Sequence, residues 1–451
     1  MLPEKLLELL REEAAPVVGC TEPVAIALAA AHAYHVAPGD VSRLEVLVSP
    51  NVFKNAKAVG IPGTSHTGVD MAAALGVSIS PPALDLNIFS SVKDADVKKA
   101  LALLEKGLVH VDIDYDLTDS LYIEVRLATS SGEAEAIIQG RHTDLVYLKH
   151  NQRLLVDKRP EKRPANGPAR LLRRHSIYEL IDLVLALDPE ALSFLKEGAE
   201  MNLRMAREGM GLKNGLGVGL NWKQLCSQGL TGKDLSNKIA YYTAAACDAR
   251  MAGVQLPVLS IAGSGNHGLV ATIPISLAAR ELGSPPRREV QALAISQLVT
   301  NYIKTYTGRL SPICGCGVAA GAGSGAGLVY LLQGSKEEMG GAIKNIISSL
   351  AGMICDGGKV GCALKLCTSA ATAWQGALLA RAGVTVPPGN GFIADSVEES
   401  LHNLGRICRE GMAGVDRTII SILEQHRRLD LLPREKEGEE QRQNERGWVQ
   451  G

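Results

Sequence analysis

Five of the nine cysteines in this chain lie between residues 314 and 367, inside two glycine-rich stretches, SPICGCGVAAGAGSG and GMICDGGKVGC. In an unbroken helix, Cys355 and Cys362 would stand about 10.5 Å apart along the axis, too far for one compact site. The glycines between them permit positive φ and a tight loop that brings both thiols together. One site that includes both thiols therefore requires a tight loop here. The five residues are Cys314, Cys316, Cys355, Cys362 and Cys367.

The redox state of these thiols depends on the compartment. The first residues, MLPEKLLELLREEAAP, have helical spacing and lack the basic region, apolar run and cleavage site of a signal peptide, so we expect a cytoplasmic protein. Thiols stay reduced there. Clustered cysteines in such a protein indicate a metal site or catalysis rather than disulfides.

Metal binding is one of two interpretations of the cysteine cluster. We expect only one of Cys314 and Cys316 to reach a shared site, which with Cys355 and Cys362 gives three thiolates. That number suits a [4Fe-4S] cluster with one open iron, and an open iron is a Lewis acid. Free cysteines are also common as small buried apolar residues, and these spacings match neither ferredoxins nor zinc knuckles. The residues alone leave both interpretations open.

The periodicity of the apolar residues changes along the chain, and the change predicts an α+β fold. Residues 1–38 are predicted as two helices that belong to a large all-helical domain. Residues 39–165 form a smaller α/β domain of short strands, inserted after those helices. A basic, proline-containing linker ends it, and helical patterns fill residues 166–430. Residues 431–451 are charged and poor in apolar residues, so we expect a flexible tail.

Composition limits the partners and the packing. Lys and Arg number 47 against 48 Asp and Glu, which gives no basic surface for nucleic acid. The uncharged run at residues 314–332 contains six glycines and suits a buried helix better than a membrane span. Aromatic residues are only 4% and glycines number 47, so helices should pack closely through Ala and Gly. We expect a small-molecule amino-acid substrate, no nucleic acid or membrane partner, and a homodimer as the assembly to test.

A sixth cysteine, Cys20, stands upstream in VVGCTEP, just before a helix predicted to begin at Thr21. The unpaired N–H groups and the dipole at a helix N-terminus can lower the pKa of a thiol, although the adjacent Glu22 opposes this. The alternative for Cys20 is a buried structural residue.

Several segments together resemble the L-cysteine desulfidase family. They are GCTEPVAIALAAA, SPNVFKNA, GIPGTSHTG, CDARMAGVQLPVLSIAGSGNHGLVATIP, RLSPICGCGVAAG, LAGMICDGGKVGC and TSAATAWQGALLA. The resemblance extends from about residue 10 to residue 420. This family is related to the iron-sulfur L-serine dehydratases, and its members degrade L-cysteine to sulfide, ammonia and pyruvate without pyridoxal phosphate.

The resemblance implies specific roles for the cysteines. It assigns a [4Fe-4S] cluster to Cys314, Cys355 and Cys362, and the catalytic thiol to Cys20, while Cys316 and Cys367 look dispensable. The implied reaction is a carbon-sulfur lyase β-elimination, in which a base removes the Cα proton and the open iron takes the departing sulfur. Serine would compete, because a hydroxyl also ligates iron.

Three polar segments are predicted to bind the substrate. Each has a simpler alternative: a turn between helices for AGSGNHG, a structural or surface histidine in SHTG, and a solvated lysine in SPNVFKNA. The predicted substrate-binding residues are Asn51, Lys54, Asn55, Ser65, His66, Thr67, Ser264, Asn266 and His267.

Two other functions remain as alternatives. AGSGNHG is similar to the SxGNH loop of pyridoxal-phosphate deaminases, which suggests a pyridoxal-dependent lyase. The chain shows no glycine tetrad for a cofactor phosphate and no upstream strand presenting a Schiff-base lysine. The second alternative is a noncatalytic iron-sulfur protein that senses redox state or iron, for which Cys20 would be replaceable.

Overall fold

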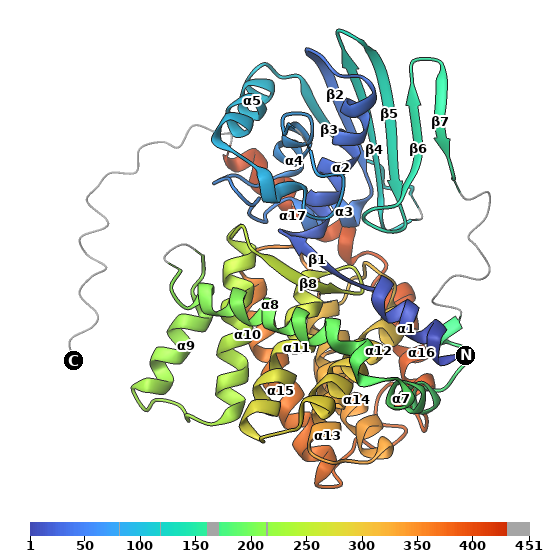
Figure 1. Ribbon diagram of the computed structural model, residues 1–451, viewed down its shortest axis with the longest axis vertical. Helices are drawn as coiled ribbons and strands as arrows, with labels where there is room; N and C mark the ends of the chain where they lie inside the picture. Colours follow the sequence, from blue (N-terminus) through green and yellow to red (C-terminus); the bar gives the residue numbers. More distant parts are fainter. Residues whose placement is uncertain (81, 118, 160–170, 213–214, 431–451) are drawn as a thin grey trace.

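A computed structural model of the chain has two stacked parts, a mixed sheet with covering helices and a larger body of helices (Figure 1). The predicted α+β class is confirmed. The predicted tail and the middle of the predicted linker lie outside the described residues. The described residues are 1–80, 82–117, 119–159, 171–212 and 215–430.

The sheet has six strands in the order β3-β2-β4-β5-β6-β7. β2 runs parallel to β3, and every other neighbouring pair is antiparallel. The apolar residues Ile123, Val125 and Leu127 of β4 are buried at every second position, the period of two expected from its sequence YIEVRLAT. The strands are β2 (Val41–Val48), β3 (Val109–Ile113), β4 (Tyr122–Thr129), β5 (Gly132–Gln139), β6 (Leu145–His150) and β7 (Arg153–Asp157).

Helix α2 (Thr21–Val36) packs on strands β4, β5 and β6 and against α4 (Val69–Gly76). This differs from the prediction, which placed all of residues 1–38 in the helical domain. Its run AIALAAAH is buried almost throughout, because its small side chains let both the sheet and α4 approach. Two shorter helices, α3 (Pro50–Ala56) and α5 (Asp94–Glu105), complete this part with the 3-10 turn Ile88–Ser91.

The helical part is centred on α13, the glycine-rich segment. A Cβ atom at Gly327 would come within 2.6 Å of the carbonyl oxygen of Ala292 on α12, so these two helices touch through their backbones as the composition predicts. Among the described residues, no helix is both long and apolar enough to cross a membrane. The helices are α1 (Pro3–Glu12), α7 (Ile177–Ala186), α8 (Ser193–Gly209), α9 (Val218–Ser227), α10 (Leu235–Met251), α11 (Gly265–Glu281), α12 (Pro286–Thr307), α13 (Gly315–Leu331), α14 (Lys336–Leu350), α15 (Cys362–Arg381) and α16 (Val397–Arg406). The last helix, α17 (Val415–Asp430), returns to the sheet-containing part and packs on α3 (Figure 1).

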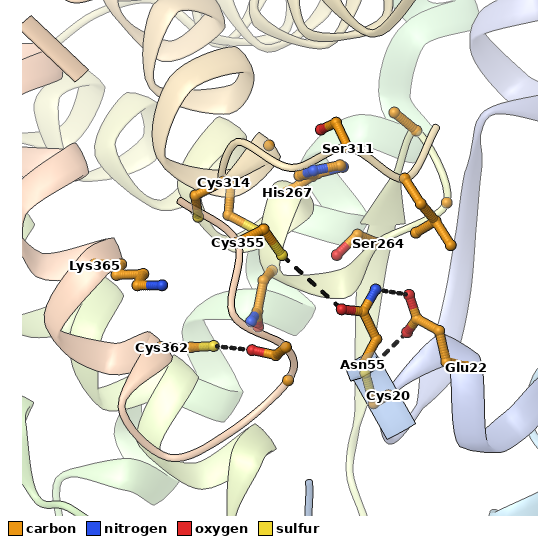
Figure 2. A pocket seen from close by; sticks show the side chains of 18 of the residues that line it. Cys20, Glu22, Asn55, Ser264, His267, Ser311, Cys314, Cys355, Cys362 and Lys365 are labelled. Carbon is orange, nitrogen blue, oxygen red and sulfur yellow. Dashed lines mark hydrogen bonds between the residues drawn. The ribbon is translucent and has the colours of Figure 1, made fainter. Parts of the chain in front are cut away.

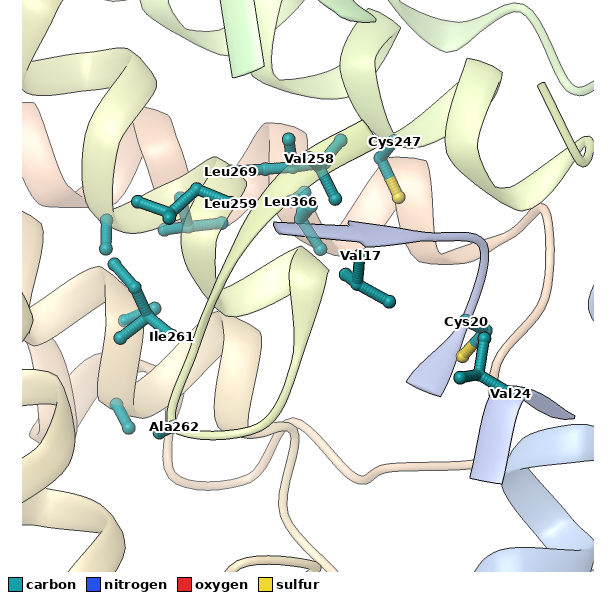
Figure 3. Close-up of a cluster of buried hydrophobic side chains, with 14 of the residues drawn as sticks. Val17, Cys20, Val24, Cys247, Val258, Leu259, Ile261, Ala262, Leu269 and Leu366 are labelled. Atoms are coloured by element: carbon teal, nitrogen blue, oxygen red, sulfur yellow. The ribbon is translucent and has the colours of Figure 1, made fainter. Parts of the chain in front are cut away.

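A two-stranded antiparallel ribbon connects the parts. β1 (Ala14–Val18) separates α1 from α2, where the sequence predicted only helices, and pairs with β8 (Pro257–Ile261). Figure 3 shows side chains of this ribbon, including Val17 and Val258, in a buried cluster that Cys20 borders. The chain leaves β1 directly toward Cys20 and leaves β8 toward the AGSGNHG loop. The ribbon thus anchors two of the predicted functional segments.

Candidate active site

A pocket lies where the two parts meet (Figure 2). It holds about 690 Å³ of space, counting its open mouth. Helices α2 and α3 of the sheet-containing part contribute to one side, and loops and helix N-termini of the helical part form the rest. The polar and sulfur-bearing lining residues are Cys20, Glu22, Asn55, Arg250, Ser264, Asn266, His267, Lys304, Arg309, Ser311, Cys314, Cys316, Cys355, Cys362 and Lys365.

Backbone hydrogen bonds hold the two cysteine-bearing loops side by side. The Cys314 amide donates to the carbonyl of Met353 at 2.7 Å, and the Cys355 amide donates to that of Pro312, also at 2.7 Å. Cys314 is the N-cap of α13, and Cys362 is the first residue of α15. The structure therefore brings the three predicted cluster ligands to one pocket wall, as the tight-loop argument requires.

The three thiols differ in acidity. A hydrogen bond with Cys316 and one from the amide of Gly317 lower the pKa of Cys314 below its usual value. Burial raises the pKa of Cys355, and burial raises the pKa of Cys362 to about 12. Cys314 is thus the thiol best prepared to be a thiolate before any metal binds.

The donor set fits a cluster better than a single ion. Among the described residues, no three His, Cys, Asp or Glu side chains converge closely enough to hold one metal ion. In an iron-sulfur cluster each cysteine binds a different iron, so the ligands need not meet at one point. Thiols facing one pocket from three backbone segments satisfy that condition. Both Cys314 and Cys316 line the pocket, whereas Cys367 is not part of the lining.

Cys20 lies across the pocket from Cys362 and, against the prediction, its thiol is not activated. Burial, followed by the negative charge of Glu22, raises the pKa of Cys20 well above its usual value. Cys20 is the N-cap of α2, but Sγ donates to Glu22 Oε2 at 3.1 Å instead of capping the helix. In the resting pocket Cys20 is therefore a protonated hydrogen-bond donor.

The sequence predicted that Glu22 opposes activation of Cys20 but not that Glu22 accepts several hydrogen bonds in the pocket. Its buried carboxylate accepts hydrogen bonds from Cys20, from Thr21 Oγ1 at 3.1 Å and from Asn55 Nδ2 at 3.0 Å. Burial opposes ionisation, but the nearby His142, whose Nε2 lies 3.8 Å from Oε1, and the hydrogen bonds from Cys20 and Asn55 outweigh it and lower the pKa of Glu22 well below its usual value. The only sequence signal was a glutamate in the first turn of a helix that is otherwise apolar.

Four of the predicted substrate-binding residues line the pocket: Asn55, Ser264, Asn266 and His267. His267 Nδ1 lies 3.0 Å from the carbonyl oxygen of Ile261, so Nδ1 carries the proton and Nε2 is an acceptor. Burial and the charge of Lys304 lower the pKa of His267 to about 3, which keeps the ring neutral.

The other five predicted residues are outside the lining. Ser65 and Thr67 are exposed and His66 is half-buried, in the loop before α4. Asn51 lies at the start of α3. Lys54 is buried, and its Nζ contacts the carbonyl oxygen of Cys355 at 2.9 Å and the carboxylate of Asp416 on α17. Lys54 thus lies behind the pocket wall.

Four cations of the pocket were not predicted: Arg250, Lys304, Arg309 and Lys365. Three are already paired, Arg250 with Asn266 and the Gly19 carbonyl, Arg309 with Glu13, and Lys365 with Asp356.

Lys304 differs from the other three cations. Nζ bonds Ser311 Oγ at 3.2 Å and has no carboxylate partner among the described residues. Burial lowers the pKa of Lys304 to about 8, partly offset by the nearby cysteines. It is therefore the cation most available to a ligand carboxylate. The segment NYIKTYTGRLSP carried no distinctive pattern for it, because an isolated lysine near a helix end is normally solvated.

Tight backbone geometry keeps this corner of the pocket open. A Cβ atom at Gly315 would stand 2.4 Å from His267 Nε2 and 3.0 Å from Lys304 Nζ. Ala262, another lining residue, has φ of 50°, a left-handed conformation that costs a non-glycine residue free energy. Such strain is typical of functional loops.

The fold and the thiol-lined pocket define a helical protein with a buried, polar, sulfur-rich site. A sequence model of the family described as serine dehydratase alpha chain matches residues 181–421. The chain belongs to the serine dehydratase alpha chain family. That membership supports a lyase-type enzyme and an association with an iron-sulfur cluster.

Relatives named UPF0597 protein are similar over nearly the whole chain. One from Alkaliphilus oremlandii (strain OhILAs) is 41% identical over 419 residues, which cover 93% of this chain and 97% of the relative. One from Clostridioides difficile (strain 630) is 41% identical over 428 residues, which cover 94% of this chain and 100% of the relative. One from Alkaliphilus metalliredigens (strain QYMF) is 40% identical over 441 residues, which cover 96% of this chain and 98% of the relative. The similarity thus includes both parts of the fold.

Proposed function

We propose that this protein is an iron-sulfur-dependent lyase that converts L-cysteine to hydrogen sulfide, ammonia and pyruvate by β-elimination, with L-serine as a competing substrate. The observation that carries the proposal is that Cys314, Cys355 and Cys362 line one pocket together with Cys20 (Figure 2). The serine dehydratase family supports the reaction class. The resemblance of the sequence to cysteine desulfidases supports the sulfur leaving group.

Cys314, Cys355 and Cys362 would hold a [4Fe-4S] cluster, which when bound supplies a Lewis-acidic iron suited to a soft thiolate leaving group. Lys304 Nζ, the hydroxyl of Ser264 and the amides at the N-terminus of α11 bind the substrate carboxylate in this proposal. Positive charge at that carboxylate also makes the Cα proton more acidic.

Cys20 is proposed as the group that takes the Cα proton. Figure 2 shows Cys20, at the start of α2, and Cys362, at the start of α15, on different sides of the pocket. In this proposal an amino acid between the two presents its Cα to Cys20 and its leaving group to the cluster side. Because the resting thiol donates to Glu22, its proton has to pass to solvent through the open pocket before Cys20 can accept another. Activation of Cys20 is therefore a step that the pocket itself must control.

Anaerobic cluster reconstitution followed by assays of sulfide and pyruvate tests the proposal. Wild type should release both from L-cysteine and pyruvate alone from L-serine. Cys20→Ala should keep its iron and lose turnover, while Cys367→Ala should keep both. Borohydride should leave the activity unchanged, because no Schiff base is involved. Absence of turnover with both amino acids, in a protein that holds its iron, would contradict the proposal and favour the noncatalytic sensor.

A further inference from the structure

The charge around the pocket is uneven. Among the described lining residues, Glu22 is the only carboxylate, whereas the cations are Arg250, Lys304, Arg309 and Lys365. An α-amino acid carries a positive and a negative group on one carbon, so a pocket that selects it must present both signs. Glu22 is the charged group in this lining that attracts an ammonium.

The Glu22 carboxylate has room for one more donor. Oε2 already accepts from Cys20 Sγ and Thr21 Oγ1, each at 3.1 Å. Oε1 accepts from Asn55 Nδ2 at 3.0 Å, and the next group, His142 Nε2, is 3.8 Å away, too far for a hydrogen bond. A carboxylate oxygen accepts about two hydrogen bonds. Within the described part of the chain, Oε1 therefore retains one accepting position.

The other side-chain acceptors in the pocket are less suitable for an ammonium. Asn266 Oδ1 is occupied by Arg250 Nη1 at 2.8 Å. His267 Nε2 lies in the same corner as the Lys304 ammonium, near Gly315, where another cation would be repelled. Asn55 Oδ1 faces Cys355 Sγ at 3.9 Å and is neutral.

We propose that Glu22 Oε1 binds the α-ammonium group of the substrate. The inference deepens the proposed function and rests on it for the amino-acid class of the substrate. A bound ammonium at Oε1 also offsets the negative charge of Glu22. That charge disfavours loss of the proton from Cys20 Sγ, which donates to the other carboxylate oxygen, Oε2. Recognition of the amino group and readiness of the catalytic thiol are then linked through one carboxylate.

Two ligands that differ only in the amino group test this assignment. L-alanine and propionate share a carboxylate and a three-carbon chain, and neither has a leaving group to eliminate. Their dissociation constants are measured by calorimetry on the full-length, anaerobically reconstituted protein. We expect wild type to bind L-alanine about 10- to 100-fold more tightly than propionate, the range for a charge-assisted hydrogen bond. Glu22→Gln should abolish that preference and leave propionate binding unchanged or tighter.

Thr21→Val is the matched control, because it removes a neighbouring donor to Oε2 and leaves Oε1 intact; it should keep the preference. If Glu22→Gln does not fold, wild type is tested with N,N,N-trimethyl-L-alanine, which keeps the charge but has no N–H and should bind as weakly as propionate. Equal affinity for L-alanine and propionate in wild type, including no binding of either, would overturn the assignment, as would a preference that survives Glu22→Gln. Because these ligands are not turned over, a protein that discriminates them yet releases no sulfide or pyruvate would refute the reaction and leave Glu22 as the ammonium site.

Discussion

Lys54 donates a hydrogen bond of 2.9 Å to the carbonyl oxygen of Cys355, and this contact joins α3 to the loop that carries a predicted cluster ligand. The same ammonium pairs with Asp416 at the start of α17. Lys54 is 1% exposed, so the pair is shielded from solvent on the lysine side. Three segments far apart in sequence thus meet at one buried charge.

Replacing Lys54 by Met should loosen the Cys355 loop and destabilise the fold. The change leaves the Asp416 carboxylate without its cation, and since Asp416 is partly exposed, we expect a loss of about 3 kcal/mol in the free energy of unfolding, the lower end for a broken buried pair. Urea unfolding of the iron-free protein measures the stability. Iron content after anaerobic reconstitution reports whether the Cys355 loop still holds its ligand in place, and we expect the iron content to fall.

Lys57→Met provides the control, because Lys57 is the C-cap of the same helix and is not in the pocket lining. It should leave iron content and stability unchanged. If Lys54→Met instead retained full iron and raised only KM for the amino acid, Lys54 would bind substrate, as the sequence predicted, rather than support the loop.

Lys304→Met should stabilise the iron-free protein. Burial lowers the Lys304 pKa from its usual 10.5 to about 8, so between these values the unfolded state binds a proton that the folded state does not. The cost of burying the charge is therefore full below pH 8 and disappears as the pH rises to 10.5. Removing the Lys304 charge should therefore raise the free energy of unfolding at pH 7 by on the order of 2 kcal/mol.

Lys304→Met should also bind carboxylate ligands more weakly. Urea unfolding at pH 7 and pH 10 measures the change in stability, and titration with propionate measures the change in binding. A gain in stability with a loss of binding is the trade-off expected of a functional buried charge. A loss of stability at pH 7 would show that the Ser311 hydrogen bond outweighs the burial of the charge.

His267 should make the protein sensitive to mild acid. Its pKa is about 3 in the folded protein against a usual 6.5, so the unfolded state binds the extra proton over this window. The stability that comes from the neutral ring is complete above pH 6.5 and is lost progressively as the pH falls toward 3. At pH 5 the loss is about 2 kcal/mol.

His267→Asn keeps a donor near the Ile261 carbonyl and cannot titrate. Urea unfolding at pH 7 and pH 5 should therefore show a smaller decrease for His267→Asn than for wild type. Parallel decreases in the two proteins would mean that the ring is protonated in the fold and that solvent reaches it.

Features set by local chemistry were predictable from the sequence. The glycine loop between Cys355 and Cys362, the helix beginning at Thr21 and the alternating strands of the sheet follow from backbone preference and periodicity. Helix α13 packs through glycine as its composition indicated. These features depend on neighbours in sequence, which a single chain displays directly.

Features that depend on distant contacts were not predictable. The activation expected for Cys20 weighed the helix N-terminus against the adjacent Glu22 but not burial, which is the largest cause of its raised pKa. Lys54 carries a charge that suits a ligand, but Asp416, more than 300 residues away, takes it. Strand β1 contains Pro16 and is too short to show a period, so only its pairing with β8 defines it. Tertiary partners outweighed local preference at each of these positions.

Cys314→Ala should abolish iron binding, whereas Cys316→Ala should retain it, although both thiols line the pocket. Cys314 Sγ accepts the Gly317 amide at 3.4 Å and has a lowered pKa, so it is available as a thiolate ligand. The pKa of Cys316 is raised well above its usual value, first by its hydrogen bond to Cys314 and then by burial, so it remains a thiol that donates to its neighbour. Iron and sulfide content after reconstitution, with the cluster absorbance, distinguishes the two variants, and Cys367→Ala serves as the control. Equal loss of iron in Cys314→Ala and Cys316→Ala would show that the two thiols share the ligand position.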